Sequence, residues 1–236
     1  MMTIPLQHFI ETSSSITDTS ALLDLYLHVV EDAGYQNAMF ARTGGRQPLS
    51  VLWDRLPVGY LDHYTALYWD RIDPILQHAQ SACMPFRWSD LMGRVHLTNR
   101  QRAFLNESRE LGVHSGITLP LHGPGTDVDL ISLSMRDHPG LVCDRLAMLH
   151  AVSVQYWLRF GELNDRPKRT VPRLTEKELE CLRWCKEGKT NWEIGEITST
   201  SEKTIEFHLS NAIRKLGACN RITAVVIGIQ SGLISL

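Results

Sequence analysis

The chain has 236 residues, of which 43% are hydrophobic, and this is enough for one large or two ordinary domains with real cores. No apolar stretch reaches the roughly 18 residues that a membrane span requires, and residues 1–20 lack a basic start followed by an apolar core, so we expect neither membrane insertion nor export. The net charge of −2 is unevenly distributed along the chain. Residues 166–236 contain 12 Lys and Arg against 8 Asp and Glu, whereas residues 1–165 contain 12 Lys and Arg against 18 Asp and Glu. Only the C-terminal part therefore favours a polyanionic partner.

The N-terminal part alternates between helical and strand patterns. Apolar residues at helical spacing predict helices over Ala21–Ala33 and Leu141–Phe160. Between these, apolar runs predict strands, of which the last two are joined as a hairpin by the turn-rich residues 122–127. The four predicted strands are Tyr35–Ala41, Leu49–Trp53, Gly116–Leu121 and Val128–Met135. Together the elements predict a central antiparallel sheet covered by helices on both sides.

A change of composition separates two predicted domains. Residues 164–173 contain two prolines, four cations and almost no apolar residue, which is typical of an interdomain linker. We therefore divide the chain into a domain over residues 1–163, a linker over 164–173 and a second domain over 174–236.

Residues 174–236 carry the signals of four short helices. Thr175 with Glu178, and Thr190 with Glu193, each form the capping box that marks a helix start. The predicted helices end at Glu187, Ile197, Leu216 and Ser231, and the last two are capped by Ser201 and Asn220. The three-residue turn 198–200 between the second and third helices predicts a helix-turn-helix module. The predicted fold class is therefore α+β, with an α-β-α sandwich linked to an all-α helix-turn-helix domain.

The third predicted helix has an apolar stripe and an opposite polar face. A helix that enters the major groove needs short or bidentate hydrogen-bonding groups, so we interpret Glu206 as an acceptor for cytosine N4 and Asn211 as a partner of adenine. Free amides and a cation at the start of the second helix favour phosphate contacts. An ordinary solvated face is the alternative, and Trp192 alone fits a core position equally well. The predicted DNA-binding residues are Lys189, Thr190, Trp192, Lys203, Thr204, Glu206, His208, Ser210, Asn211 and Arg214.

This module resembles the LuxR-type DNA-binding domain of bacterial transcription regulators. The similarity runs from Leu174 to Leu216 and covers the whole helix-turn-helix. Glu178, Leu182 and Gly188 match positions that are nearly invariant in that family. The resemblance implies a regulator that binds double-stranded DNA.

The N-terminal domain resembles a different part of the same regulators. Residues 1–165 contain twelve arginines and no lysine, which argues against a phosphoreceiver domain because that domain needs an acidic pocket and a lysine. The segments Pro57–Tyr64, Arg71–Pro74, Pro85–Trp88 and Gly116–Gly123 resemble the acyl-homoserine lactone domain of quorum-sensing LuxR regulators, in particular their LasR-like branch. The resemblance therefore spans nearly the full chain.

The resemblance implies a pocket for an N-acyl-homoserine lactone. Asp73 would accept a hydrogen bond from the ligand N–H, while Tyr64 and Ser132 would donate to the acyl carbonyl. Trp88 would pack on the lactone ring. Tyr60 stands where the family usually has a tryptophan that donates to the lactone carbonyl, and the shorter phenol leaves room for a bridging water or for a non-lactone signal. The candidate contacts of the acyl tail are Leu56, Ile75, Val113, Leu119 and Leu130.

Enzymatic, metal and redox functions have little support in the sequence. Neither a Gly-x-Ser-x-Gly motif nor a metal-binding histidine cluster nor a phosphate loop is present, so we predict that the protein is not an enzyme and needs no cofactor or metal. The odd number of scattered cysteines indicates reduced thiols in a cytoplasm. Cys181 and Cys185 lack further ligands at zinc spacing and are predicted to be core residues.

The expected assembly is a homodimer. One short recognition helix reads too few base pairs to be specific, so we expect two copies on an inverted repeat with half-sites about 10 bp apart. The candidate dimer interfaces are Leu141–Phe160 and the last helix, Ile222–Ile229. The expected partners are double-stranded DNA, the lactone and RNA polymerase, without a membrane. The alternative is a LuxR-type regulator that responds to a non-lactone small molecule or acts without a ligand.

Overall fold

The computed structural model describes residues 6–44, 47–122, 128–136, 145–164 and 173–235. They belong to two compact units, the first with residues 23–149 and the second with residues 5–22 and 150–236. The predicted hairpin turn, residues 123–127, and most of the predicted linker, residues 165–172, lie outside the described residues. The predicted domain boundary near residue 163 therefore stays a prediction.

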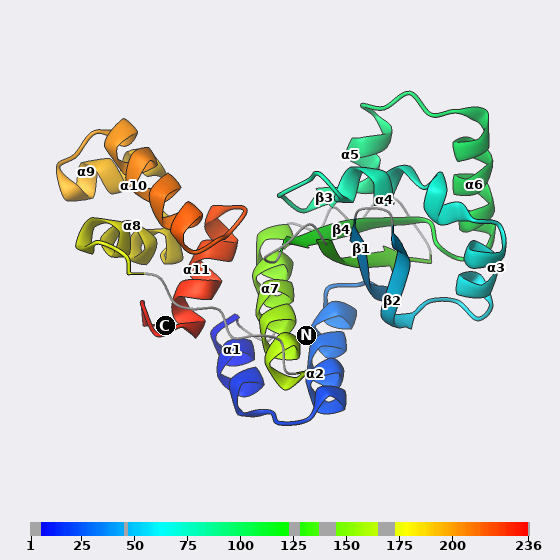
Figure 1. Ribbon diagram of the computed structural model, residues 1–236, viewed down its shortest axis with the longest axis horizontal. Helices are drawn as coiled ribbons and strands as arrows, with labels where there is room; N and C mark the ends of the chain where they lie inside the picture. The colour runs from blue at the N-terminus through cyan, green and yellow to red at the C-terminus, as the bar shows by residue number, and fades with distance from the viewer. Residues whose placement is uncertain (1–5, 45–46, 123–127, 137–144, 165–172, 236) are drawn as a thin grey trace. The chain divides into compact units, whose positions relative to one another are not determined.

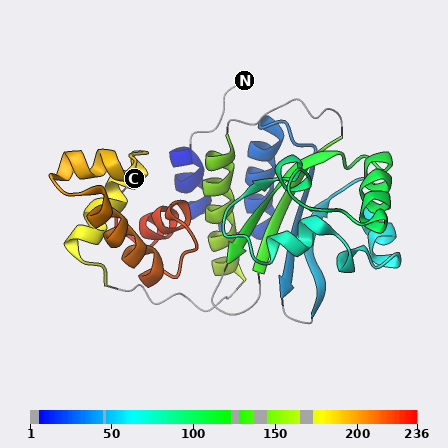
Figure 2. The same cartoon turned by 90° about the horizontal axis from the view of Figure 1, so that it is seen from above.

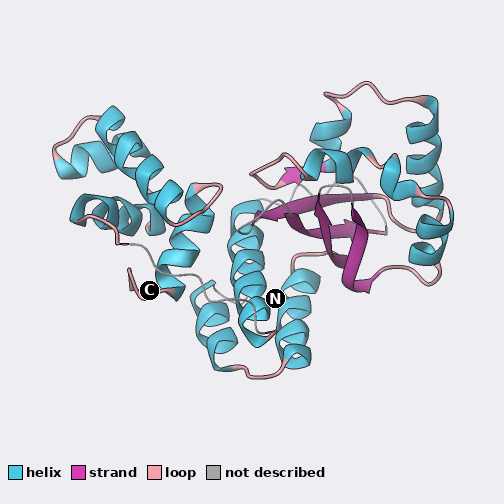
Figure 3. Cartoon of the chain, viewed as in Figure 1, coloured by secondary structure: helices cyan, strands magenta, loops and turns pink. Residues whose placement is uncertain are grey.

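The first unit is built on one antiparallel sheet with the strand order β2-β1-β5-β4-β3 (Figure 3). The hairpin predicted from alternating apolar residues pairs β4 with β5 so that Thr118 lies opposite Ser132. β5 pairs on its other side with β1, where Met39 lies opposite Ser132. The strands are β1 (Asn37–Gly44), β2 (Gln47–Arg55), β3 (Phe86–Arg87), β4 (Ser115–His122) and β5 (Val128–Met135).

Helices cover both faces of this sheet (Figures 1 and 2). On one face, Leu76 and Ala79 of α4 pack against Ala41 and Leu130 of the strands. On the other face, the ring of Tyr26 in α2 meets the ring of Trp53 edge-on, with the ring centroids 6.2 Å apart. This arrangement confirms the predicted α-β-α sandwich. The helices of this unit are α2 (Thr19–Asp32), which starts in the second unit, α3 (Tyr60–Ala66), the 3₁₀ turn Trp69–Arg71, α4 (Pro74–Ala79), α5 (Trp88–Met92) and α6 (Asn99–Glu110). The helix α7 (Leu146–Leu163) begins in this unit and continues in the second.

The second unit contains α1 (Leu6–Ser15), the C-terminal part of α7 and four short helices that form the predicted helix-turn-helix module. Both predicted capping boxes are present, at Thr175 and Thr190, and Ser201 and Asn220 cap the next two helices as expected. Gly195 allows the tight turn, because a Cβ atom there would lie 2.7 Å from the carbonyl oxygen of Thr200. The four helices are α8 (Glu176–Lys186), α9 (Asn191–Thr198), α10 (Glu202–Lys215) and α11 (Arg221–Gln230).

The helix α7 begins at Leu146, whereas the sequence predicted a start at Leu141, and residues 141–144 lie outside the described part of the chain. It contains 18 residues and is the longest of the described helices. None of the described helices combines the length and the apolar character needed to cross a membrane.

Candidate functional site

A cavity of about 300 Å³ lies in the first unit, between the sheet and the helices α3 to α6. Buried apolar side chains form most of its wall, and a few polar groups interrupt it. Nine of the ten predicted ligand residues line this cavity: Leu56, Tyr60, Tyr64, Asp73, Ile75, Trp88, Val113, Leu130 and Ser132. The fold thus brings together residues that lie up to 76 positions apart in the sequence, from 56 to 132.

Leu119 is the predicted contact that does not line the cavity. Successive side chains of a strand point to opposite faces, and Thr118 faces the cavity. Leu119 therefore points to the other face, where it pairs with Ile131 and is fully buried. Its apolar character serves the core between the sheet and the opposite helix layer.

Asp73 is a buried carboxyl group in the wall of the cavity. It caps α4, because its Oδ1 accepts hydrogen bonds from the backbone N–H of Ile75 at 2.8 Å and of Leu76 at 3.4 Å. Its Oδ2 accepts a hydrogen bond from the Tyr64 hydroxyl at 3.0 Å. Burial raises the pKa of Asp73 to about 6, although these hydrogen bonds lower it in part. The group is therefore mostly an anion at pH 7 and can accept a further hydrogen bond.

The two tyrosines of α3 point into the same cavity with their hydroxyl groups already engaged. The hydroxyl group of Tyr64 donates its hydrogen bond to Asp73. Toward the cavity this hydroxyl can therefore act only as an acceptor, not as the predicted donor. The hydroxyl of Tyr60 lies 3.1 Å from Oγ of Ser108 on α6, and either can be the donor. Burial raises the pKa of both phenols, so both are neutral across the physiological range.

Trp88 is held against the sheet by a chain of hydrogen bonds. Its indole Nε1 donates to Oγ1 of Thr118 at 2.9 Å, and Thr118 Oγ1 lies 3.0 Å from Oγ of Ser132. Gly116 leaves space for the ring, because a Cβ atom there would lie 3.0 Å from the indole. The indole is therefore oriented by the first unit itself, and Trp88 forms part of the cavity wall.

Several lining residues were not predicted from the sequence. Thr118 could have been found from the strand pairing, because it lies directly opposite the predicted ligand residue Ser132 and therefore on the same face of the sheet. The α6 residues Ser108 and Arg109 gave no such signal, since the helix pattern alone does not reveal which face meets a cavity. The further lining residues include Met39, Leu49, Phe104, Leu105, His114 and Ser115.

The polar face predicted on α10 is present. Lys203, Glu206, Ser210 and Arg214 are exposed. Most of the apolar stripe is buried, namely Ile205, Leu209, Ala212 and Leu216. The remaining predicted residues of this helix, Thr204, His208 and Asn211, are partly buried.

The start of α9 presents a second set of predicted residues, of which Thr190 and Trp192 are exposed and Lys189 is partly buried. Thr190 caps the helix, and the ammonium group of Lys189 lies 3.4 Å from the carboxylate of Glu193. The side chain of Trp192 is 60% exposed, so the core interpretation that the sequence left open is wrong for this residue. Sequence reasoning missed Phe207, which is 64% exposed on α10.

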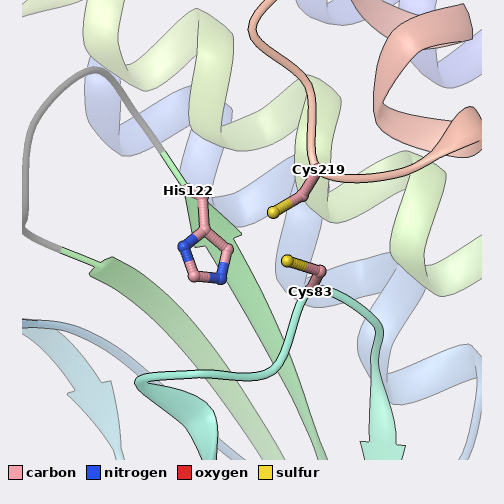
Figure 4. A group of neighbouring side chains, drawn as sticks. All are labelled: Cys83, His122 and Cys219. Carbon is pink, nitrogen blue, oxygen red and sulfur yellow. The ribbon is translucent and has the colours of Figure 1, made fainter. Parts of the chain in front are cut away.

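Cys181 and Cys185 are free thiols. Cys181 lies in the core of the helix-turn-helix module, and burial raises the pKa of its thiol to about 11. Figure 4 draws Cys83 and His122, which belong to the first unit, and Cys219, which belongs to the second. Within the first unit, His122 Nε2 donates to the carbonyl oxygen of Ala82 at 2.7 Å. These two side chains of the first unit are fewer ligands than a zinc site requires, so we assign no zinc to the pair.

Comparisons with known proteins identify two families along the chain. Residues 18–160 match the autoinducer binding domain, and residues 172–227 match the luxR family of bacterial regulatory proteins. The transcriptional activator protein VanR of Vibrio anguillarum is 32% identical over 190 residues, which cover 79% of this chain and 78% of VanR. The HTH-type transcriptional regulator y4qH of Sinorhizobium fredii is 30% identical over 181 residues. These residues make up 76% of this chain but only 56% of the longer y4qH. A structure of SdiA in complex with octanoyl-rac-glycerol has the same fold, with a TM-score of 0.57, 22% identity, and coverage of 98% of this chain and 96% of that chain.

Proposed function

The chain belongs to the LuxR family of autoinducer-binding regulators, and from this premise we propose that it binds an N-acyl-homoserine lactone in the cavity of the first unit. A ligand-responsive, DNA-binding regulator is the function that the family establishes. The lactone, the homodimer and the inverted-repeat site are our proposals.

The buried carboxylate of Asp73 is the observation that carries the lactone proposal. Its oxygens have about four lone-pair sites, and the fold uses three of them, through Tyr64 and two backbone N–H groups. A buried carboxylate is costly unless its acceptors are used, so the remaining site favours a ligand with an N–H donor. The amide of an acyl-homoserine lactone supplies this donor.

The other parts of the ligand have chemically matched walls. The indole of Trp88 offers a flat apolar surface for the lactone ring. Met39, Leu49, Ile75 and Leu130 offer apolar contacts for an acyl chain. At about 300 Å³ the cavity lies at the lower end of the range for small-molecule sites, which favours a single compact ligand.

Thermal unfolding of the full chain tests the lactone proposal. We expect lactones with chains from butanoyl to dodecanoyl to raise Tm, by roughly 5–10 °C for the best of them, because a ligand that binds only the folded state stabilises it. An ester analogue, in which oxygen replaces the amide N–H, should give a much smaller shift at the same concentration. If no lactone shifts Tm, the lactone proposal fails while DNA binding stands.

A different head group is the second candidate, and the pair Tyr60 and Ser108 is the observation that favours it. Two hydroxyl groups 3.1 Å apart can both donate and accept, whereas the family's tryptophan at this position only donates. Such a pair suits a ligand with hydroxyl groups, and SdiA provides an example of a related fold in complex with octanoyl-rac-glycerol. Octanoyl-rac-glycerol therefore belongs in the same thermal assay, and a larger shift than with any lactone would favour this candidate.

The DNA-binding unit in our proposal is a homodimer on an inverted repeat in promoter DNA. Two copies of α10 would read half-sites about 10 bp apart. We infer that Glu206 accepts from cytosine N4, Asn211 pairs with adenine, and Lys189 and Arg214 contact phosphate. Helices α7 and α11 are the proposed dimer interfaces, RNA polymerase is a proposed partner, and regulation takes place in the cytoplasm without catalysis. Light scattering of the ligand-bound protein would test the dimer directly.

A further inference from the structure

Phe207 stands out as a large apolar side chain on the polar face of α10. Its side chain is 64% exposed, although burying a phenylalanine fully would stabilise a fold substantially. The ring centroid lies 5.7 Å from that of His208, which is its immediate neighbour in the chain. The module's own core does not include Phe207, so the fold does not explain this residue.

The position of Phe207 on the helix is central to the exposed face. Lys203, Phe207, Ser210 and Arg214 follow one another at spacings of four, three and four residues, so they form one stripe along the helix. The buried stripe, which includes Ile205, is offset from them by two residues and lies on the opposite side. Along this stripe, the phenyl ring of Phe207 therefore lies between two cations, Lys203 and Arg214.

These observations distinguish between the partners that an exposed phenylalanine can have. An apolar protein surface would be a poor partner, because Lys203 and Arg214 would then lose solvent as well. A polyanion with apolar groups between its charges fits both the cations and the ring. The major groove of DNA has this character, since thymine carries a C5-methyl group there and phosphates flank the groove.

We propose that Phe207 is a specificity-determining residue that recognises thymine by packing on its C5-methyl group in the major groove. The inference deepens the proposed function, because it rests on the placement of α10 in the groove. Glu206, which precedes Phe207, recognises the edge of a cytosine base by hydrogen bonding, whereas Phe207 recognises the methyl group of thymine. Adjacent base pairs are therefore distinguished by different chemistry.

Deoxyuridine substitution tests this directly, because uracil lacks the methyl group and keeps the Watson–Crick edge of thymine. Duplexes are first selected from a random pool by the full-length protein, with and without a panel of N-acyl-homoserine lactones. Each thymine of the selected site is then replaced singly by deoxyuridine, and Kd is measured. We expect one thymine in each half-site at which the replacement weakens binding about fourfold, and about 15-fold when both half-sites are changed.

Variants of Phe207 test whether this residue causes the loss of affinity on deoxyuridine replacement. In Phe207→Ala the same replacement should change Kd less than twofold, whereas Phe207→Leu should retain part of the loss. The matched control is Trp192→Ala, which removes an equally exposed aromatic ring from α9 and should keep the full fourfold loss. Because Phe207 is exposed, its variants should unfold at the same temperature as the parent.

Two results would overturn the proposal. One is a parent protein that is insensitive to deoxyuridine at every thymine, and the other is a Phe207→Ala variant that keeps the full penalty. Failure to enrich any duplex under any condition would instead contradict DNA binding itself, and the proposal with it.

Discussion

At the scale of single residues, the carboxyl group of Asp73 is suited to bind a ligand but lowers the stability of the folded protein. Burial raises its pKa to about 6, so the folded protein resists ionisation of this group more than the unfolded chain does. The same carboxylate caps α4 and holds the Tyr64 hydroxyl. A site that accepts a ligand N–H is thus maintained at a cost in stability in the empty protein.

The variant Asp73→Asn tests whether the buried carboxylate lowers stability, because this loss of stability should depend on pH. The folded state of the parent binds more protons than the unfolded state between pH 4 and pH 6, so its stability falls as pH rises through this window and then stays level. Asparagine caps a helix equally well and carries no charge. At pH 7 we expect Asp73→Asn to be more stable than the empty parent by on the order of 1–3 kcal/mol, with the difference vanishing near pH 4.

Urea unfolding at pH values from 4 to 7.5 measures this difference. The buried His150, whose pKa burial lowers to about 4, is present in both proteins, so its effect cancels when they are compared. A difference that is constant with pH would show that Asp73 does not titrate in this window.

Also at this scale, Tyr60→Phe tests whether the phenol takes part in binding the ligand head group. Loss of one hydrogen-bonding group should weaken binding of the preferred ligand about threefold to tenfold. The matched variant Ser108→Ala keeps the phenol and frees it from its partner. Calorimetry of both variants would contradict this role if Tyr60→Phe bound the ligand as tightly as the parent.

At the scale of elements, the helix-turn-helix module contains an ion pair between a buried glutamate and a partly exposed lysine. Glu178 is 3% exposed and completes the capping box of α8, while Nζ of Lys215 at the end of α10 donates to its Oε2 at 2.8 Å. Burial opposes ionisation of Glu178, but the bonds to Lys215 and Thr175 outweigh it and lower the pKa of the carboxyl. One side chain therefore caps one helix and joins it to another.

Removal of this side chain should destabilise the module. We expect Glu178→Ala to cost about 1–3 kcal/mol, because a capping group is lost and Lys215 loses the carboxylate of Glu178. Lys177→Ala removes a surface pair with Glu180 on the same helix and should leave the denaturation midpoint unchanged. Equal effects of the two variants on urea unfolding would rule out this role for Glu178.

The turn between α9 and α10 gives a second test at this scale. Gly195→Ala would place a Cβ atom 2.7 Å from a backbone carbonyl oxygen, which the turn cannot relieve without moving, so we expect a loss of about 1–3 kcal/mol. Gly228→Ala on α11 has only ordinary contacts, 3.4 Å or more to side-chain atoms, and should be neutral or slightly stabilising. Circular dichroism melts of both variants check the difference.

Some elements could be predicted from sequence because their signals are local. The caps of α8 to α11 depend on residues three positions apart, and each was found where it was expected. The helices α3, α4 and α5 are only five to seven residues long and are held by packing around the cavity, so they have no periodic pattern to detect. Leu119 shows the same limit, because alternation separates two faces of a strand without telling which one meets the cavity.

At the scale of the whole molecule, the family assigns ligand sensing to the first unit and DNA binding to the helix-turn-helix module. The charge distribution is consistent with this division, since the excess of positive charge lies in residues 166–236. We propose that a coupling free energy links the two functions, so that bound ligand changes the affinity of the protein for DNA. By reciprocity, specific DNA should tighten ligand binding by the same factor.

The affinity of the full-length protein for its selected duplex, measured by fluorescence anisotropy with and without the best lactone, tests this account most directly. We predict that the lactone lowers Kd for the inverted repeat at least tenfold, and that Asp73→Asn binds the duplex without responding to the lactone. The account would be contradicted if the parent bound the duplex with the same Kd at every lactone concentration, or if Asp73→Asn responded as strongly as the parent.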